Sequence, residues 1–249
     1  MIGGFETIIL EKDRGVAHLA LNRPQVLNAF NTTMRDEMWQ ALEMIRCDPE
    51  VGVVLLRGEG ERAFCAGADL SEFGTAPSQV IARQVRFERG VWELWLSIPK
   101  PFVCALQGYV LGSGIEMALL CDLRIADEDA LFGMPEVALG MIPAAGGTQT
   151  LTHTVGIPQA LGLLLTNRRV NAGEALSLGL VNRVVHRDRL LVEAEFIARS
   201  LLSRGPLALR LLKEAVLRGM ELPLPQALEL ESTLALQSFL SSAHSDVSK

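Results

Sequence analysis

The chain has 249 residues, of which 49% are hydrophobic, so it is long enough for one large domain or two small ones with a sizeable core. Its formal net charge of −6 argues against a general nucleic-acid-binding surface, and an anionic ligand would need a local basic patch. No apolar run reaches the roughly 18 residues that a membrane span requires, and the N-terminus has neither the basic nor the long apolar region of a secretory signal. We therefore expect a cytoplasmic protein that binds neither nucleic acid nor membranes.

In the first two thirds of the chain, short apolar runs bounded by turns alternate with segments of helical periodicity. We expect strands over residues 7–10, 16–21, 51–57, 102–106, 123–126 and 181–185, with a polar turn at 11–15. We expect helices from Asn31 or Thr32, as the N-cap, to about 45, and over 79–96, 113–120, 146–155, 158–165, 189–202, 207–217 and 225–240. This order predicts an α/β fold with parallel strands, followed by a mostly helical C-terminal third.

Two glutamates stand in segments marked by glycine or proline. Glu116 lies in the sequence L-G-S-G-I-E-M at 111–117, and Glu136 ends the sequence F-G-M-P-E at 132–136. Two carboxyls that converge on one pocket can hold a water and move protons. Taken singly, each has a plainer explanation, because a lone glutamate is usually solvated or sits in the first turn of a helix.

The Gly-Ser-Gly segment at 112–114 fits a ligand-binding helix N-terminus better than two other motifs. A dinucleotide fingerprint would need glycine where Met117 stands, and a nucleophile elbow would need glycines in place of Leu111 and Ile115. A helix N-terminus offers exposed N–H groups, and glycine lets the backbone approach a ligand closely. A tight packing turn is the alternative.

A second segment of small residues, A-G-A-D at 66–69, would also let a bulky ligand approach the backbone. Asp69 is expected to cap the helix that follows. Two such segments can supply N–H donors to a carbonyl oxygen, and with the two glutamates they suggest enolate chemistry on an acyl group without a metal. The four cysteines, which lack C-x-x-C spacing and a nearby histidine, are expected to be thiols in a reducing compartment.

Seven segments together resemble the enoyl-CoA hydratase/isomerase (crotonase) family over about residues 7–239. In chain order they are N-R-P-Q-V-L-N-A at 22–29, A-F-C-A-G-A-D-L at 63–70, K-P at 100–101, G-Y-V-L-G-S-G-I-E-M-A at 108–118, C-D-L-R-I-A at 121–126, F-G-M-P-E at 132–136 and G-M-I-P-A-A-G-G-T-Q at 140–149. The combination is much more specific than any one of its parts.

The resemblance implies a crotonase-like core of repeated β-β-α units over residues 1–190, and a helical trimerisation region over 191–249 that stops short of the family's basic last helix. It implies self-association to a trimer or a dimer of trimers. The substrate would be an acyl-CoA thioester, with no metal and no separate cofactor, because CoA is part of the substrate.

The resemblance also assigns site residues by position. The backbone N–H groups of Ala68 and Ser113 would form the oxyanion hole, and Glu116 and Glu136 match the two catalytic glutamates of the hydratases. The CoA cleft would be lined by Gln25, Val26, Leu27, Ala66, Gly67, Ala68, Asp69, Leu70, Gly112 and Ser113. The hydratases usually carry a glycine where this chain has Ser113, so we expect a reshaped pocket there.

The leading hypothesis is hydration of a 2-enoyl-CoA, in which Glu116 activates a water for attack at Cβ and Glu136 delivers a proton to Cα. The runner-up is a Δ3-Δ2-enoyl-CoA isomerase or another enolate-forming enzyme, since Glu136 alone could move a proton between Cα and Cγ. A non-catalytic binding or scaffold protein, including an RNA-binding one, is the alternative from another class. Arg83, Arg86 and Arg89 recur on the predicted helix, but a solvated face explains them as well as nucleic acid does.

Overall fold

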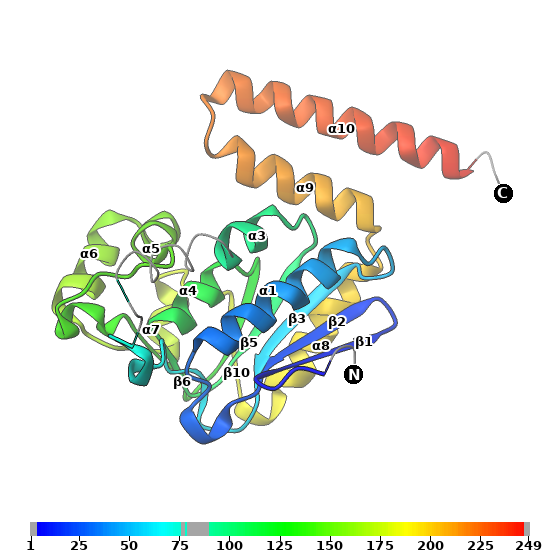
Figure 1. Ribbon diagram of the computed structural model, residues 1–249. Helices are drawn as coiled ribbons and strands as arrows, with labels where there is room; N and C mark the ends of the chain where they lie inside the picture. The colour runs from blue at the N-terminus through cyan, green and yellow to red at the C-terminus, as the bar shows by residue number, and fades with distance from the viewer. Residues whose placement is uncertain (1–3, 76–77, 79–89, 247–249) are drawn as a thin grey trace.

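Six strands form the larger of two sheets in the computed structural model, which describes residues 4–75, 78 and 90–246 (Figure 1). Their order across the sheet is β1 (Ile8–Asp13), β2 (Val16–Leu21), β3 (Val53–Gly58), β5 (Phe102–Leu106), β7 (Leu123–Asp127) and β10 (Arg183–Val185). β1 and β2 pair antiparallel, whereas every later pair is parallel. The predicted α/β fold with parallel strands is confirmed.

The β1–β2 hairpin turns later in the chain than the sequence predicted. Arg14 and Gly15 form a two-residue turn with φ values of 41° and 87°, and positive φ at both positions suits the twist of two antiparallel strands. The prediction of a polar turn at 11–15 was wrong, because residues 11–13 continue β1 and pair with β2. Charged side chains fit there because β1 lies at the edge of the sheet, where charge discourages pairing with another chain.

A second, smaller sheet was not predicted. It consists of β4 (Ala63–Cys65), β6 (Tyr109–Leu111), β8 (Leu131–Gly133) and β9 (Val170–Asn171), in that order. β4, β6 and β8 run parallel to one another, and β9 is antiparallel to β8. Strands of two or three residues carry too few positions to show a period of two, so hydrophobic patterning could not reveal them.

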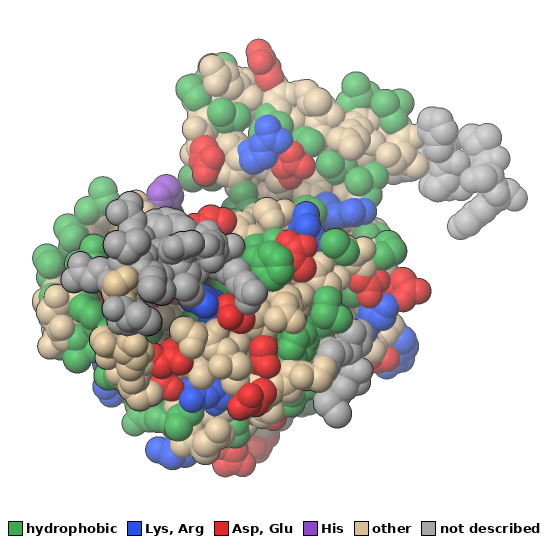
Figure 2. Space-filling view, in the orientation of Figure 1, with side chains coloured by type: hydrophobic (Ala, Val, Ile, Leu, Met, Phe, Trp, Pro, Cys, Tyr) green, Lys and Arg blue, Asp and Glu red, His purple; other side chains and the backbone are tan. Residues whose placement is uncertain are grey.

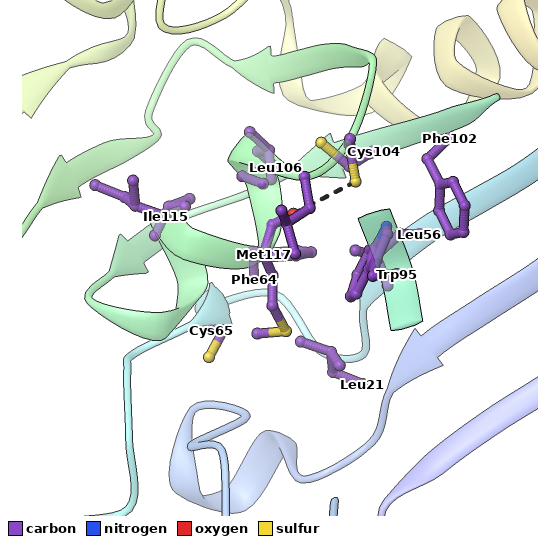
Figure 3. Close-up of a cluster of buried hydrophobic side chains, with 14 of the residues drawn as sticks. Leu21, Leu56, Phe64, Cys65, Trp95, Phe102, Cys104, Leu106, Ile115 and Met117 are labelled. Atoms are coloured by element: carbon purple, nitrogen blue, oxygen red, sulfur yellow. Dashed lines mark hydrogen bonds between the residues drawn. The ribbon is translucent and has the colours of Figure 1, made fainter. Parts of the chain in front are cut away.

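The helices of the described chain are α1 (Thr32–Cys47), α3 (Val91–Ser97), α4 (Ser113–Leu119), α5 (Gly147–Val155), α6 (Ile157–Thr166), α7 (Ala172–Ser177), α8 (Leu190–Leu202), α9 (Pro206–Gly219) and α10 (Leu224–Asp246). Of these, α1 and α8 cover opposite faces of the larger sheet. Along β3, Val54 and Leu56 belong to the buried cluster shared with α1, part of which is drawn in Figure 3, whereas Val53 and Leu55 belong to the cluster shared with α8. This alternation explains why β3 reads as a continuous apolar run: both of its faces are covered.

The helix predicted over 79–96 falls only partly within the described chain. Its end is α3, which begins after Gly90, and residues 79–89 lie outside the described residues together with Arg83, Arg86 and Arg89. The predicted helices at 146–155, 158–165, 189–202, 207–217 and 225–240 correspond to α5, α6, α8, α9 and α10. α7 was not predicted.

Helices α9 and α10 form a hairpin that projects from the two-sheet body (Figure 1). The hairpin is held at Lys213, whose Nζ donates to Asp122 Oδ2 at 2.8 Å and to the Lys100 carbonyl at 3.0 Å. Figure 2 shows hydrophobic side chains on its surface, and the exposed ones include Leu212, Val216, Met220, Leu224, Leu236 and Phe239. Within the described part of the chain, no helix has the combined length and apolar character needed to cross a bilayer.

Asn31, not Thr32, caps α1: its side chain accepts a hydrogen bond from Met34 N at 2.9 Å. We expect Asn31→Ala to lower the free energy of unfolding by about 1 kcal/mol, because one of the unpaired N–H groups of the first turn loses its acceptor. The exposed neighbour Thr33 provides the control, and Thr33→Ala should change stability by less than about 0.5 kcal/mol. Urea denaturation followed by circular dichroism measures both, and equal effects would contradict the capping role.

Candidate active site

Three neighbouring strands of the smaller sheet end at the same place. β4, β6 and β8 are parallel, and they lead into the segments at 66–70, at 112–113 and at 134–136. Gly112 N donates to Gly133 O at 2.9 Å, and a Cβ placed on Gly67 would lie 3.3 Å from Leu111 O. The carboxyl ends of adjacent parallel strands are where ligands bind in open α/β sheets. The three marked segments of the sequence therefore meet at one site.

Gly112 is the point at which these segments touch. Its φ of 50° and ψ of −117° are unfavourable for any residue with a side chain. A Cβ on Gly112 would lie 2.8 Å from Glu136 Oε1 and 3.6 Å from Gly67 Cα. Glycine thus lets the Glu136 carboxyl and the two backbone segments come together.

Two backbone N–H groups in these segments have no acceptor among the residues that the structure describes. Ser113 is the first residue of α4, so its N–H has no partner within the helix. Ala68 forms a parallel bridge with Phe30, in which Phe30 N donates to Gly67 O at 2.8 Å and Asp69 N donates to Phe30 O at 2.9 Å. In such a bridge the N–H of the middle residue, Ala68, points away from Phe30. This pair of donors is suited to an oxygen that gains negative charge.

Glu116 is buried, with 2% of its surface exposed, so the solvated position usual for a lone glutamate does not apply. It lies in the first turn of α4, and its Oε1 accepts hydrogen bonds from Ala145 N and Gly147 N, both at 2.9 Å. Gly147 is the first residue of α5, so the positive end of that helix also faces the carboxyl. Both donors favour the ionised carboxylate, the form that can act as a base.

Glu136 has the opposite surroundings. It lies in the first turn of the 3₁₀ segment Pro135–Leu139, and its Oε2 is buried without a hydrogen-bond partner among the described residues. Burial raises the pKa of Glu136 above its ordinary value, and the nearby Glu116 carboxyl raises it further. The Glu136 backbone N–H donates to the carboxyl and lowers the pKa, but burial has the larger effect and favours the neutral form, which can give up a proton. The site therefore pairs a carboxyl held by two N–H groups with a carboxyl whose pKa is raised, an arrangement suited to a base and an acid.

Eight of the ten residues predicted to line a CoA cleft lie on two adjacent segments, and the other two, Gly112 and Ser113, lie at the start of α4. Gln25 and Val26 belong to the 3₁₀ turn Pro24–Val26, and Leu27 follows it. The second segment, 66–70, lies alongside, because Ala66 N donates to Leu27 O at 3.0 Å. Asp69 accepts from Ser71 N at 3.1 Å, so its predicted helix-capping role is confirmed for the short 3₁₀ turn Leu70–Glu72.

Two groups that hold Glu116 were not predicted, namely the backbone N–H groups of Ala145 and Gly147. The Gly-Gly pair at 146–147, placed before a predicted helix, was the available signal, since such a helix start presents free N–H groups. The sequence could not show which side chain they would bind, because the contact joins residues about thirty positions apart.

Comparison with known proteins gives a consistent result. The model of the family described as enoyl-CoA hydratase/isomerase matches residues 11–248. A short-chain-enoyl-CoA hydratase of Clostridium acetobutylicum is 41% identical over 90% of this chain and 86% of its own length. A crotonyl-CoA hydratase of Syntrophomonas wolfei is 41% identical over 92% and 88%. A crystal structure of enoyl-CoA hydratase from Bacillus anthracis superposes with a TM-score of 0.87 at 35% identity, covering 95% of this chain and 97% of that one.

Proposed function

The chain belongs to the enoyl-CoA hydratase/isomerase family, and from this premise we propose that it adds water across the 2,3 double bond of a 2-enoyl-CoA thioester. The observation that carries the proposal is the contrast between the two glutamates: Glu116 is held by two N–H donors, whereas Glu136 Oε2 is buried without one. Hydration needs one base and one acid at the same time, and these surroundings favour that division. The two relatives named short-chain-enoyl-CoA and crotonyl-CoA hydratase support a short acyl group.

In the proposed reaction, the thioester oxygen accepts hydrogen bonds from Ala68 N and Ser113 N. As the water oxygen bonds to Cβ, the electrons of the double bond move towards Cα and the thioester oxygen, which becomes an enolate oxygen. Donors already in place stabilise that charge more than they stabilise the ground state, and removing one such donor costs about 3 kcal/mol in other enzymes. No metal is needed for this polarisation, and CoA enters as part of the substrate.

The protons balance between the two carboxyls. Glu116 takes a proton from the attacking water, and Glu136 gives its own proton to Cα, so the product is a 3-hydroxyacyl-CoA. Glu116 is then neutral and Glu136 ionised, and a proton transfer from the first to the second restores the starting state. The raised pKa of Glu136 favours the direction of this last transfer.

The experiment that tests the proposal mixes the purified protein with crotonyl-CoA and follows loss of the 2-enoyl thioester absorbance. Turnover to 3-hydroxybutyryl-CoA supports hydration. An enzyme that leaves crotonyl-CoA unchanged but converts a 3-enoyl-CoA to the 2-enoyl isomer would contradict it in favour of an isomerase. A protein that binds acyl-CoA without converting either substrate would favour the non-catalytic alternative.

The pH dependence of kcat should carry the signature of Glu136. An acid must be neutral to donate, so on the alkaline side of the profile kcat should fall as the pH rises through the pKa of Glu136, and on the acidic side it is limited because the base Glu116 must be ionised. Because burial raises this pKa, the fall should come at a higher pH than for an ordinary glutamate. Measuring kcat with saturating crotonyl-CoA across the pH range tests this, with the unfolding temperature recorded at each pH as the control. A kcat that rises steadily over the same range would contradict the assignment.

The oligomeric state belongs to the same proposal. The α9–α10 hairpin leaves Leu212, Met220 and Phe239 between 63% and 79% exposed, which supports burial against other copies of the chain. We expect a trimer or hexamer of the 27.1 kDa chain, measurable by light scattering after gel filtration.

A cytoplasmic location is also proposed, supported by the free thiols of Cys47, Cys65, Cys104 and Cys121.

A further inference from the structure

Arg23 makes two contacts that the proposed reaction does not use. Its Nη1 donates to the carbonyl of Ala29 at 2.6 Å and to Asp69 Oδ2 at 2.9 Å. Both charged side chains are mostly shielded from solvent, at 17% and 15% exposed. One guanidinium nitrogen therefore ties together two segments that are far apart in sequence.

These two segments are the ones that carry the Ala68 bridge. Ala29 directly precedes Phe30, and Asp69 directly follows Ala68. Phe30 in turn binds the peptides on both sides of Ala68, through Gly67 O and Asp69 N. The contacts of Arg23 and Phe30 thus hold the chain on both sides of the Ala68 peptide. Together they restrict how far the Ala68 N–H can rotate relative to the site.

The two oxygens of the Asp69 carboxylate accept hydrogen bonds from different residues. Oδ1 accepts from Ser71 N at 3.1 Å and from Ser71 Oγ at 2.6 Å, whereas Oδ2 accepts from Arg23. The Ser71 hydrogen bond, and then Arg23, lower the pKa of Asp69, so the pair stays charged at neutral pH. Because the two oxygens have different partners, substitution can separate capping of the turn from the pairing with Arg23.

We propose that Arg23 is a positioning residue for the reaction: by holding Ala29 and Asp69 together, it aims the Ala68 N–H at the thioester oxygen. This inference rests on the proposed oxyanion role of Ala68. A donor stabilises an enolate oxygen only at hydrogen-bond distance and with good alignment, so a small rotation of the peptide weakens catalysis more than it weakens binding. Arg23 itself need not touch the substrate.

Three variants test the proposal. Arg23→Gln shortens the side chain and removes the charge, so both contacts are lost. Asp69→Asn retains an oxygen for Ser71 but presents an amide N–H₂ to Arg23, so it breaks the pair alone. Ser71→Ala is the matched control, since it removes the hydroxyl from the other oxygen of the same carboxylate. We expect kcat for crotonyl-CoA to fall about tenfold or more in Arg23→Gln and Asp69→Asn, part of the 10²–10³-fold that loss of a whole oxyanion donor costs. We expect KM to change less than about threefold in each, and kcat of Ser71→Ala to stay within about twofold of wild type.

A spectroscopic readout distinguishes positioning from a purely structural role. Donors at the thioester oxygen polarise a conjugated acyl group, so a bound 3-aryl-2-enoyl-CoA should absorb at longer wavelength than the same thioester in water. We expect this shift to shrink in Arg23→Gln and Asp69→Asn at nearly unchanged affinity, and to persist in Ser71→Ala. The double variant should be no worse than the more affected single one, because both act on one contact.

Two patterns of results would overturn the inference. In one, both variants retain the wild-type kcat and absorbance shift. In the other, they lose affinity or unfolding temperature while the shift per bound ligand persists, which would make the pair structural. Failure of the wild type to hydrate crotonyl-CoA would count against the proposed function instead, and the absorbance shift of the bound probe would still decide the role of Arg23.

Discussion

Replacing Glu136 by glutamine is expected to lower kcat for crotonyl-CoA hydration by about 10²–10⁴-fold, the usual contribution of a general acid or base. The amide has nearly the shape of the carboxyl but cannot give a proton to Cα. Since Glu136 Oε2 has no hydrogen-bond partner among the described residues, the substitution breaks no bond at that atom, and the unfolding temperature should stay near the wild-type value. Stopped-flow absorbance and thermal denaturation measure the two quantities.

Glu116→Gln should lower kcat by a similar factor for a different reason. The glutamine oxygen can still accept from Ala145 N and Gly147 N, but the amide cannot take the proton of the attacking water. Glu221, exposed after α9, gives the control, and Glu221→Gln should leave kcat unchanged. Wild-type turnover in either catalytic variant would refute the assignment of that glutamate, and a loss that matched a lower unfolding temperature would point to misfolding.

The larger sheet could be predicted from sequence because β2, β3 and β5 are long and mostly buried. Residues 102–106 and 123–126 matched β5 and β7 closely, and in β5 five consecutive apolar positions between turns leave few alternatives. The prediction of a turn at 11–15 was wrong because the charged residues Glu11 to Asp13 resemble a turn. They fit a strand only because that strand lies at the edge of the sheet. That position is known only from the assembled sheet.

The candidate site, too, was predictable from the sequence only in part. Glycine and proline marked the three segments correctly, because backbone geometry leaves a local trace in the sequence. The state of each glutamate leaves no such trace, since it depends on partners brought together by folding: the loop before α5 for Glu116, and Gly112 for Glu136. The sequence shows neither the burial of a carboxyl nor its N–H donors, yet burial favours the neutral form and the donors favour the ionised form.

Gly112→Ala should disable the site more completely than its single methyl group suggests. The new Cβ would lie 2.8 Å from Glu136 Oε1, and the backbone would be held at a φ of 50° that alanine disfavours. Relief requires either that Glu136 withdraw or that the Gly112–Ser113 peptide turn, which would move the proposed acid or a proposed oxyanion donor. We expect kcat to fall by at least about 10²-fold, the effect of displacing a catalytic group by about 1 Å, and stability to fall by about 1–3 kcal/mol from backbone strain.

Gly179→Ala separates strain from collision, because Gly179 also has a positive φ of 72° but no atom lies within 4 Å of its added Cβ. It should lose less stability than Gly112→Ala, because only backbone strain acts there, and it should keep the wild-type kcat. A second comparison places Gly112→Ala in a Glu136→Ala background, where the carboxyl that the methyl would meet is gone. The stability cost of Gly112→Ala should then shrink towards that of Gly179→Ala, as expected for two groups in direct contact. An undiminished cost would mean that backbone strain alone, rather than closeness to Glu136, requires glycine at this position.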